Sequence, residues 1–214
     1  MQGGMNGFDH PIFSESMRRI RGWLEPTGLL AGLTPLEQEV VERLVHSSGD
    51  LSVASGVRFS PGACALGLEA LLAGVPILTD TAMAAAAVAP MARRTFGNPV
   101  RSVLDWAPAV APEGGTRAAA GLDSALELHP GSVVLIGSAP TALVRLLERV
   151  AAGAARPALV VGMPVGFVGV LESKALLAAS ELPQIRLEGS RGGAGLVGAS
   201  VNALLRRAWL DRHG

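Results

Sequence analysis

The sequence predicts an α/β protein with a doubly wound, five-stranded parallel sheet preceded by N-terminal helices. Two observations lead to this prediction. In the first third of the chain apolar residues recur at helical spacing, whereas after Gly74 short apolar runs alternate with longer helical stretches. Strands that alternate with helices pair in parallel through right-handed crossovers, so helices are expected on both faces of the sheet.

Three helices are predicted in the N-terminal third. The segment from Ser14 to Leu24 has the pattern of a short amphipathic helix. The second helix begins with a capping box at Thr34-Pro35-Leu36-Glu37, carries one apolar stripe and ends at Gly49. The third begins at Ser60-Pro61 and ends at Gly74.

The remainder of the chain is predicted to form the sheet and the helices that cover it. Strands are expected at Val75 to Leu78, Val100 to Leu104, Val133 to Ile136, Leu159 to Val161 and Ile185 to Leu187. Helices are expected near Ala82 to Val88, Thr116 to Leu126, Thr141 to Val150, Ser173 to Ala179 and Leu196 to Trp209. In such sheets ligands bind beyond the carboxyl ends of the strands, so candidate site residues are sought there.

The composition excludes several classes of protein. The 18 basic and 18 acidic side chains balance, and the few aromatic residues include no tyrosine, so we expect no nucleic-acid partner. The uncharged stretches are too short for a membrane span, and the N-terminus lacks the features of a secretory signal. One cysteine and four scattered histidines give neither a disulfide nor zinc-ligand spacing. We expect one cytoplasmic domain over residues 1–214, with no membrane partner and no bound metal.

The basic residues are seventeen arginines and a single lysine, Lys174. One explanation is codon usage in a GC-rich genome, which the many alanines also suggest. The alternative is recognition of carboxylates, because a guanidinium holds a carboxylate with two hydrogen bonds whereas an ammonium acts as a point charge.

The segment from Gly193 to Gly198 matches the GxGxxG pattern of dinucleotide-binding proteins, and it lies between a predicted strand and a helix. Only sixteen residues follow it, too few for the second strand and the acidic residue that would bind the ribose. A tight turn with glycines for close packing, or a helix N-terminus that receives a carboxylate, is therefore favoured over NAD binding.

His46 lies in the last turn of the second predicted helix, on the side opposite the apolar stripe and near Glu39 and Glu42. It is either a surface imidazole or a proton donor. The negative end of the helix dipole is expected to favour the charged imidazolium and so to raise its pKa. No serine or cysteine lies in a recognisable nucleophile motif, so acid catalysis by a histidine is the simpler chemistry.

Polar residues at the predicted strand ends have structural and functional interpretations. Asp80 follows a strand and precedes a helix, where an aspartate is commonly the N-cap. The glycine-containing segments after two other strands, which include Ser138 and Thr141, are either tight turns or loops that approach a ligand closely. Arg117 follows Thr116 at a helix start, where a cation is unfavourable without an anionic partner, either a substrate or a structural acid.

Taken together, these segments resemble the precorrin-8X methylmutase family, also called cobalt-precorrin-8 methylmutase, over nearly the whole chain. The resemblance rests on seven segments: Arg43-Leu44-Val45-His46 with Gly49-Asp50, Phe59-Ser60-Pro61, Asp80 with Met83, Thr116-Arg117, the run from Gly137 to Leu143, the run from Gly162 to Gly169, and Glu172-Ser173-Lys174.

The resemblance implies an isomerase of cobalamin biosynthesis that moves a methyl group from C-11 to C-12 of a tetrapyrrole by a 1,5-sigmatropic shift. The product would be hydrogenobyrinic acid, or cobyrinic acid from the cobalt form. The resemblance further implies a flavodoxin-like sheet, no redox cofactor or catalytic metal, and a homodimer with the site near the subunit interface. His46 matches the histidine that donates and accepts the proton.

The substrate implied by the resemblance is a polycarboxylate, so arginines, hydroxyls and helix N-termini are the groups its recognition needs. The candidate substrate-binding residues are Ser16, Arg43, Asp80, Thr116, Arg117, Ser138, Thr141, Lys174 and Arg191. The chain departs from the family pattern at Ser138, where asparagine is common, at Phe13, where tyrosine is frequent, at Ala87, which replaces a glycine, and in the segment from Glu188 to Ala194, which has lost two arginines and a serine.

The altered C-terminal arginines also suggest an alternative, a protein of the same fold that holds a corrinoid without rearranging it. A dinucleotide oxidoreductase is the third hypothesis and predicts a thermal shift with NAD(P).

Overall fold

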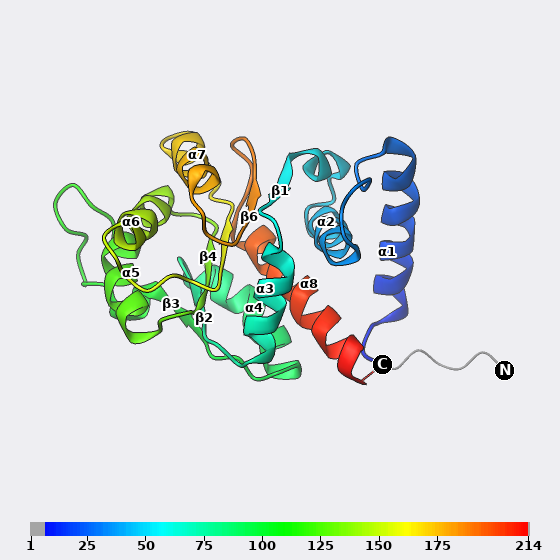
Figure 1. Cartoon of the computed structure of the whole chain (residues 1–214), viewed down its shortest axis with the longest axis horizontal. Helices are drawn as coiled ribbons and strands as arrows, with labels where there is room; N and C mark the ends of the chain where they lie inside the picture. The colour runs from blue at the N-terminus through cyan, green and yellow to red at the C-terminus, as the bar shows by residue number, and fades with distance from the viewer. Residues whose placement is uncertain (1–6, 214) are drawn as a thin grey trace.

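The computed structural model describes residues 7–213, so residues 1–6 and residue 214 lie outside that range. Residues 1–6 are part of the N-terminus that is expected to lack a secretory signal. Six strands form one sheet in the order β1-β6-β5-β4-β2-β3. Their bounds are β1 Val57–Phe59, β2 Ile77–Thr79, β3 Val100–Ser102, β4 Val133–Ile136, β5 Leu159–Gly162 and β6 Gln184–Leu187. Figure 1 shows the sheet between two groups of helices.

The five predicted strands are present and pair in parallel, but the sheet is not the five-stranded parallel sheet that the sequence predicted. A sixth strand, β1, adds to the edge of β6 in the antiparallel direction, with Val57 opposite Leu187 and Phe59 opposite Ile185. The fold is therefore α/β with a mixed sheet. Three residues of alternating burial are too short to give a periodic signal, so β1 could not be recognised in the sequence.

All eight predicted helices are present. They are α1 Pro11–Leu24, α2 Pro35–Ser48, α3 Ala63–Leu72, α4 Ala82–Arg94, α5 Arg117–Leu128, α6 Pro140–Ala151, α7 Val170–Ala179 and α8 Ala194–His213. Three short 3₁₀ segments were not predicted: η1 Glu25–Thr27, η2 Leu51–Gly56 and η3 Val103–Trp106. The predicted capping box of α2 is formed by Thr34 and Glu37. Helix α4 continues past Pro90 to Arg94, beyond the predicted end near Val88, and packs along α8.

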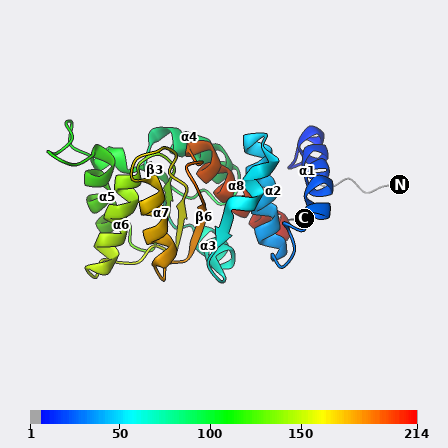
Figure 2. The ribbon, with the colours of Figure 1, turned by 90° about the horizontal axis from the view of Figure 1, so that it is seen from above.

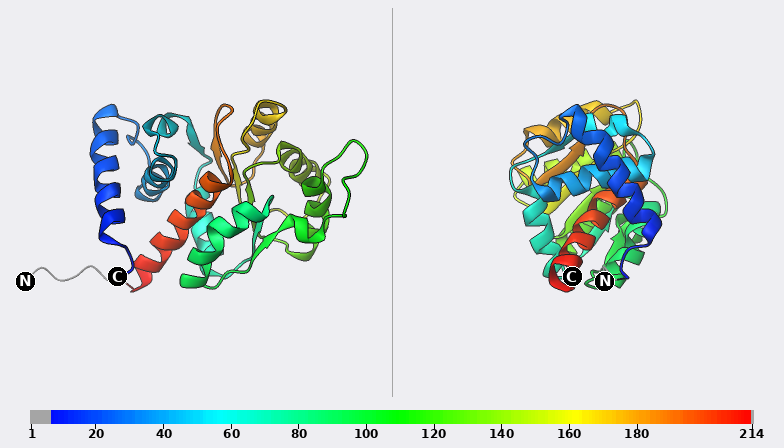
Figure 3. Two further views of the ribbon diagram at one scale, coloured as in Figure 1. Left: turned by 180° about the vertical axis from the view of Figure 1, so that it is seen from behind. Right: turned by 90° about the vertical axis from the view of Figure 1, so that its right-hand side faces the viewer.

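Two hydrophobic clusters lie on the two faces of the sheet. Alternate strand residues such as Leu135 and Val161 face α2, α3, α4 and α8, whereas Val134 and Val160 face α5, α6 and α7. Figure 2 shows these layers in sequence, with α2 and then α1 outside α8, and the left-hand view of Figure 3 shows the same order. The alternation of neighbouring strand residues between the two clusters is what a sheet covered on both sides requires.

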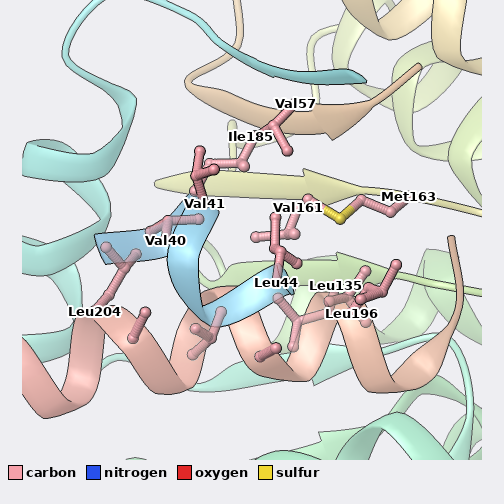
Figure 4. Packing of buried hydrophobic residues seen from close by; sticks show 14 of the residues in the cluster. Val40, Val41, Leu44, Val57, Leu135, Val161, Met163, Ile185, Leu196 and Leu204 are labelled. Carbon is pink, nitrogen blue, oxygen red and sulfur yellow. The ribbon is translucent and has the colours of Figure 1, made fainter. Parts of the chain in front are cut away.

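Helix α2 extends the first cluster beyond α8. Its Val40, Val41 and Leu44 are fully or almost fully buried, and Figure 4 shows Leu44 beside Leu135 of β4 and Leu196 of α8. Leu44, in the C-terminal half of α2, thereby lies near β4 and the first turn of α8. The opposite face of α2, which carries the polar residues Glu39 and Glu42, packs against α1 and is therefore largely buried as well.

The strand order reverses between β2 and β4, because β3 returns to the outer side of β2 before the chain crosses to β4. In open α/β sheets the crevice at such a reversal is where ligands bind, outside the carboxyl ends of the strands. The segments that follow β2, β4, β5 and β6 meet at this edge. No helix in the described part of the chain is long and apolar enough to cross a membrane.

Candidate active site

His46 lies in the last turn of α2 with its ring exposed, as the sequence predicted. Its Nδ1 atom is 2.8 Å from the hydroxyl oxygen of Ser16 in α1, and the ring of Phe13 meets it edge-on at 5.2 Å. No described residue hydrogen-bonds Nε2, so this nitrogen is the one available to a ligand. The contact with Ser16 brings together two of the predicted site residues that are thirty positions apart in the sequence.

The sequence predicted that the helix dipole raises the pKa of His46, and this direction is wrong. Partial burial, and then the positive charge of Arg43, hold the pKa of the imidazole below its ordinary value. Glu39 and Glu42 do not counter this shift, because each is paired with an arginine, Glu39 with Arg206 and Glu42 with Arg21.

Arg43 lies one turn before His46 and is half-buried. Its guanidinium stacks over the ring of Phe13, 4.6 Å from the ring centre, but it forms no hydrogen bond or ion pair with the described residues. Burial, and then the charge of Arg206, lower the pKa of Arg43. A half-buried guanidinium without a carboxylate partner fits a site whose ligand brings the anion.

An open cavity of about 1000 Å³ lies beneath α1, between that helix, α2 and the end of α8. It shares Phe13 with the His46 cluster, but neither His46 nor Arg43 lines it. The charged groups that line the cavity are largely paired with one another, as in the ion pairs of Arg21 with Glu42 and of Arg206 with Asp9. A polyanionic ligand would have to break these pairs.

The loops after β4, β5 and β6 are joined through their backbones at the carboxyl edge. The Val165 N–H donates to the Gly137 carbonyl at 3.1 Å, the Gly166 N–H to Ser190 at 3.0 Å, and the Gly193 N–H to Met163 at 2.9 Å. The approach is so close that a Cβ atom at Gly192 would lie 1.9 Å from the Met163 carbonyl oxygen. The three loops therefore form one surface.

Arg191 connects this surface to the end of α2. Its guanidinium donates to Asp50 Oδ2 at 2.8 Å and to the Ser52 hydroxyl at 2.7 Å. Asp50 comes four residues after His46, so the ion pair ties the loop after β6 to the segment that follows the histidine. The sequence assigned no role to Asp50 and Ser52, although Asp50 belongs to a segment that carries the family resemblance.

Lys174 is buried in α7 and donates from Nζ to the carbonyls of Gly189 and Arg191, both at 2.7 Å. Burial lowers the pKa of this ammonium to about 8. This geometry does not favour the predicted contact between Lys174 and a ligand, because the ammonium donates to the backbone of the loop that carries Arg191.

Asp80 is not the N-cap of the helix that follows it. Thr81 caps α4 by accepting a hydrogen bond from the Ala84 N–H. Asp80 is fully buried, and its carboxylate accepts hydrogen bonds from the backbone of Gly137, Ser138 and Ala139. Burial raises the pKa of Asp80, while these hydrogen bonds act in the opposite direction.

The remaining predicted residues lie near this turn. The Thr116 hydroxyl, which caps α5, is 2.8 Å from the Thr141 hydroxyl at the start of α6. Arg117 is exposed and donates from Nε to the Pro108 carbonyl at 2.8 Å, so its partner in the structure is neither an acid nor a ligand. Ser138 is partly exposed, and its hydroxyl makes no hydrogen bond to the described residues. Within residues 7–213 no group of three or more His, Cys, Asp and Glu side chains is placed to hold a metal ion.

Of the three glycines of the GxGxxG segment, Gly198 allows close helix packing. Gly198 faces Ala87 of α4, where an added Cβ would lie 2.8 Å from the Ala87 side chain, and Asn202 donates to the Ala87 carbonyl. Helix α8 begins at Ala194 and continues to His213, so no second strand follows it in the described chain. The dinucleotide interpretation has no support in this arrangement.

Comparisons with known proteins show which family this chain resembles. The family model described as precorrin-8X methylmutase matches residues 11–207. The precorrin-8X methylmutase of Pseudomonas aeruginosa is 44% identical, with 90% of this chain and 93% of that protein covered. The cobalt-precorrin-8 methylmutase of Synechocystis is 38% identical, with 95% and 98% covered.

A solved structure described as precorrin-8X methylmutase from Thermus thermophilus superposes with a TM-score of 0.83 at 41% identity, covering 94% of this chain and 96% of that one. A match of this extent in sequence and in structure, together with the motifs at the sheet edge, establishes the family. The chain belongs to the precorrin-8X methylmutase family.

Proposed function

We propose that this chain catalyses the methyl shift from C-11 to C-12 of precorrin-8X, or of its cobalt form, with His46 as the proton donor. Membership of the family supports the isomerase role in cobalamin biosynthesis. The main observation behind the proposed site is that two groups lie one helical turn apart at the end of α2: an imidazole nitrogen of His46 that is available to a ligand, and the guanidinium of Arg43, which forms no ion pair with the described residues.

The proposed chemistry conserves atoms and protons. His46 Nε2 gives a proton to the macrocycle, which draws electron density from the ring and eases migration of the methyl group. The bond from the methyl carbon to C-11 breaks while the bond to C-12 forms. Because the product is an isomer of the substrate, the proton returns to the same nitrogen, and Ser16 on Nδ1 holds the ring in place throughout.

We assign substrate binding to the surface between α2 and the sheet edge. Arg43 would bind one carboxylate of the macrocycle, and the hydroxyls of Ser138, Thr116 and Thr141 would bind others. Arg117 at the start of α5 and Arg191 after β6 would add positive charge at the rim. A unimolecular shift needs no second reactant, so much of the rate enhancement would come from holding the macrocycle in one orientation.

We further propose that the whole chain, as one domain, works as a homodimer. Phe167 and Val168, in the loop after β5, are 95% and 87% exposed, and Met83 at the start of α4 is 68% exposed. Large apolar side chains this exposed are typical of surfaces covered by a partner or a ligand. Light scattering of the purified protein tests this state.

A single-turnover assay tests the function. Purified protein in excess over precorrin-8X, and separately over the cobalt form, should convert the absorption spectrum to that of the product. Tight binding with the methyl group still on C-11 would instead identify a corrinoid carrier, the alternative suggested by the altered segment from Glu188 to Ala194.

The pH dependence should report the lowered pKa of His46. If the protonated imidazole is the active form, kcat/KM, which reflects the free enzyme, falls as the pH rises through a value below about 6.5. Carboxylates of the bound substrate would raise that pKa, so kcat should fall at a higher pH than kcat/KM. Steady-state rates between pH 5 and 8 measure both, and a kcat/KM that increases with pH across this range contradicts the role of an acid.

A further inference from the structure

Asp80 lies fully buried between the carboxyl ends of β2 and β4, where the strand order reverses. Its Oδ2 atom accepts three hydrogen bonds from consecutive backbone N–H groups, at 3.1 Å from Gly137, 2.6 Å from Ser138 and 2.8 Å from Ala139. Its Oδ1 atom has no hydrogen-bond partner among the described residues. One carboxylate oxygen therefore binds all three amides of the turn that joins β4 to α6.

The turn needs an acceptor from elsewhere in the chain. Helix α6 begins at Pro140, and its N-cap residue, Ala139, has no side chain that can accept a hydrogen bond. The amides at a helix start are otherwise unpaired, and the helix dipole makes this end positive. Such consecutive N–H groups form a binding place for an external anion. Asp80 supplies that anion from within the protein.

The same turn carries two of the hydroxyls in the proposed substrate surface. Ser138 is the middle residue of the turn, and Thr141 lies in the first turn of α6, where its hydroxyl is fixed by the contact with Thr116 at 2.8 Å. The position of both hydroxyls therefore depends on the conformation of the turn. Asp80 itself is covered by protein and does not contact the surface on which they lie.

We propose that Asp80 is a positioning residue for the methyl shift: it takes the amides of Gly137 to Ala139 in place of a substrate carboxylate and fixes the turn so that Ser138 and Thr141 present hydroxyls to the macrocycle. This inference rests on the proposed function, because those hydroxyls matter only if the substrate binds at this edge. In this proposal Asp80 acts through the turn and does not contact the substrate directly, as the sequence had suggested it would.

The test compares Asp80→Ala and Asp80→Asn in the full-length protein. Asp80→Ala removes the acceptor, and we expect KM to rise by roughly tenfold or more while kcat changes by less than about threefold. Asp80→Asn keeps one acceptor oxygen but loses the charge, so its KM should lie between those of the wild type and the alanine variant. Hydrogen exchange of the peptide that contains residues 137–139 should be faster in both variants.

Asn98→Ala is the matched control. Asn98 is also a buried polar side chain, and its Nδ2 donates to the backbone carbonyls of Leu71 and Val75. It precedes β3 and therefore lies at the amino end of the strand, away from the carboxyl edge. Its removal should lower the melting temperature and leave KM unchanged. If Asp80→Ala does not fold, KM and hydrogen exchange of Asp80→Asn decide the question.

Two results would overturn the inference. A hundredfold loss of kcat in Asp80→Asn with unchanged KM would place Asp80 in the proton transfer, and a lowered melting temperature with unchanged KM in both variants would make its role purely structural. Turnover by the wild type and its loss in a His46 variant test the proposed function separately. If both of those hold while KM does not respond to Asp80, only the positioning role fails.

Discussion

Replacing His46 by alanine should lower the rate of the methyl shift by a factor of roughly 10²–10⁴, the range that a positioned acid or base contributes. Binding of the product should change by less than about threefold, because the proposed contacts to the carboxylates come from Arg43 and the loop hydroxyls and not from the imidazole. Single-turnover kinetics measure the first effect, and titration of the corrinoid absorption measures the second.

His129→Ala is a suitable control for this variant. His129 follows α5, and its ring lies edge-on against Trp106 at 5.3 Å, away from the His46 cluster. Loss of a histidine there should leave the rate unchanged. A His46 variant that turns over at the rate of the wild type would show that another group moves the proton. Equal losses of rate and of binding would make His46 a binding residue.

Gly192→Ala should separate the loops that form the binding surface. An alanine Cβ would lie 1.9 Å from the Met163 carbonyl oxygen and 2.9 Å from that of Pro164, so the loop after β6 must move away from the loop after β5. Because Arg191 is adjacent, its ion pair with Asp50 should be disturbed as well. We expect a loss of roughly 1–3 kcal/mol of unfolding free energy, typical of overpacking, and clearly weaker product binding.

Gly195→Ala, three residues later, gives the matched comparison. Gly195 lies in the first turn of α8, and a Cβ there would meet no other atom within 4 Å. Alanine at this helical position should raise stability by about 0.5–1 kcal/mol and leave product binding as it is. Chemical denaturation of both variants measures the difference. A Gly192 variant as stable as the wild type would show that the loop contact does not fix the surface.

Most of the fold could be predicted because it depends on local patterns. The capping box at Thr34 and the buried run from Val133 to Ile136 each predicted an element that the structure contains. The antiparallel strand β1 could not be predicted, since three residues acquire a strand conformation only through pairing with β6. The enclosure of Glu39 and Glu42 was likewise hidden, because it depends on how α1 and α8 pack against α2.

The candidate site was predictable in its residues but not in their contacts. Their positions at a helix end and a strand end indicated His46 and Asp80, and the family resemblance added Lys174 as a binding residue, but the partners of these residues lie far away in the sequence. Asp80 binds a turn 57 to 59 residues later, and Lys174 binds the loop that holds Arg191. The direction of the His46 pKa shift was missed for the same reason, since the dipole of α2 is a local property whereas the contact with α1, which partly buries the histidine, is a tertiary one.

The most direct test of the account is a crystal structure of the protein with its product bound. We predict that the macrocycle lies between α2 and the carboxyl edge of the sheet, with His46 Nε2 about 3 Å from a ring atom, Ser16 on Nδ1, and a carboxylate on Arg43. A macrocycle seated in the cavity beneath α1, with His46 out of reach, would contradict the proposed site and the role of the histidine.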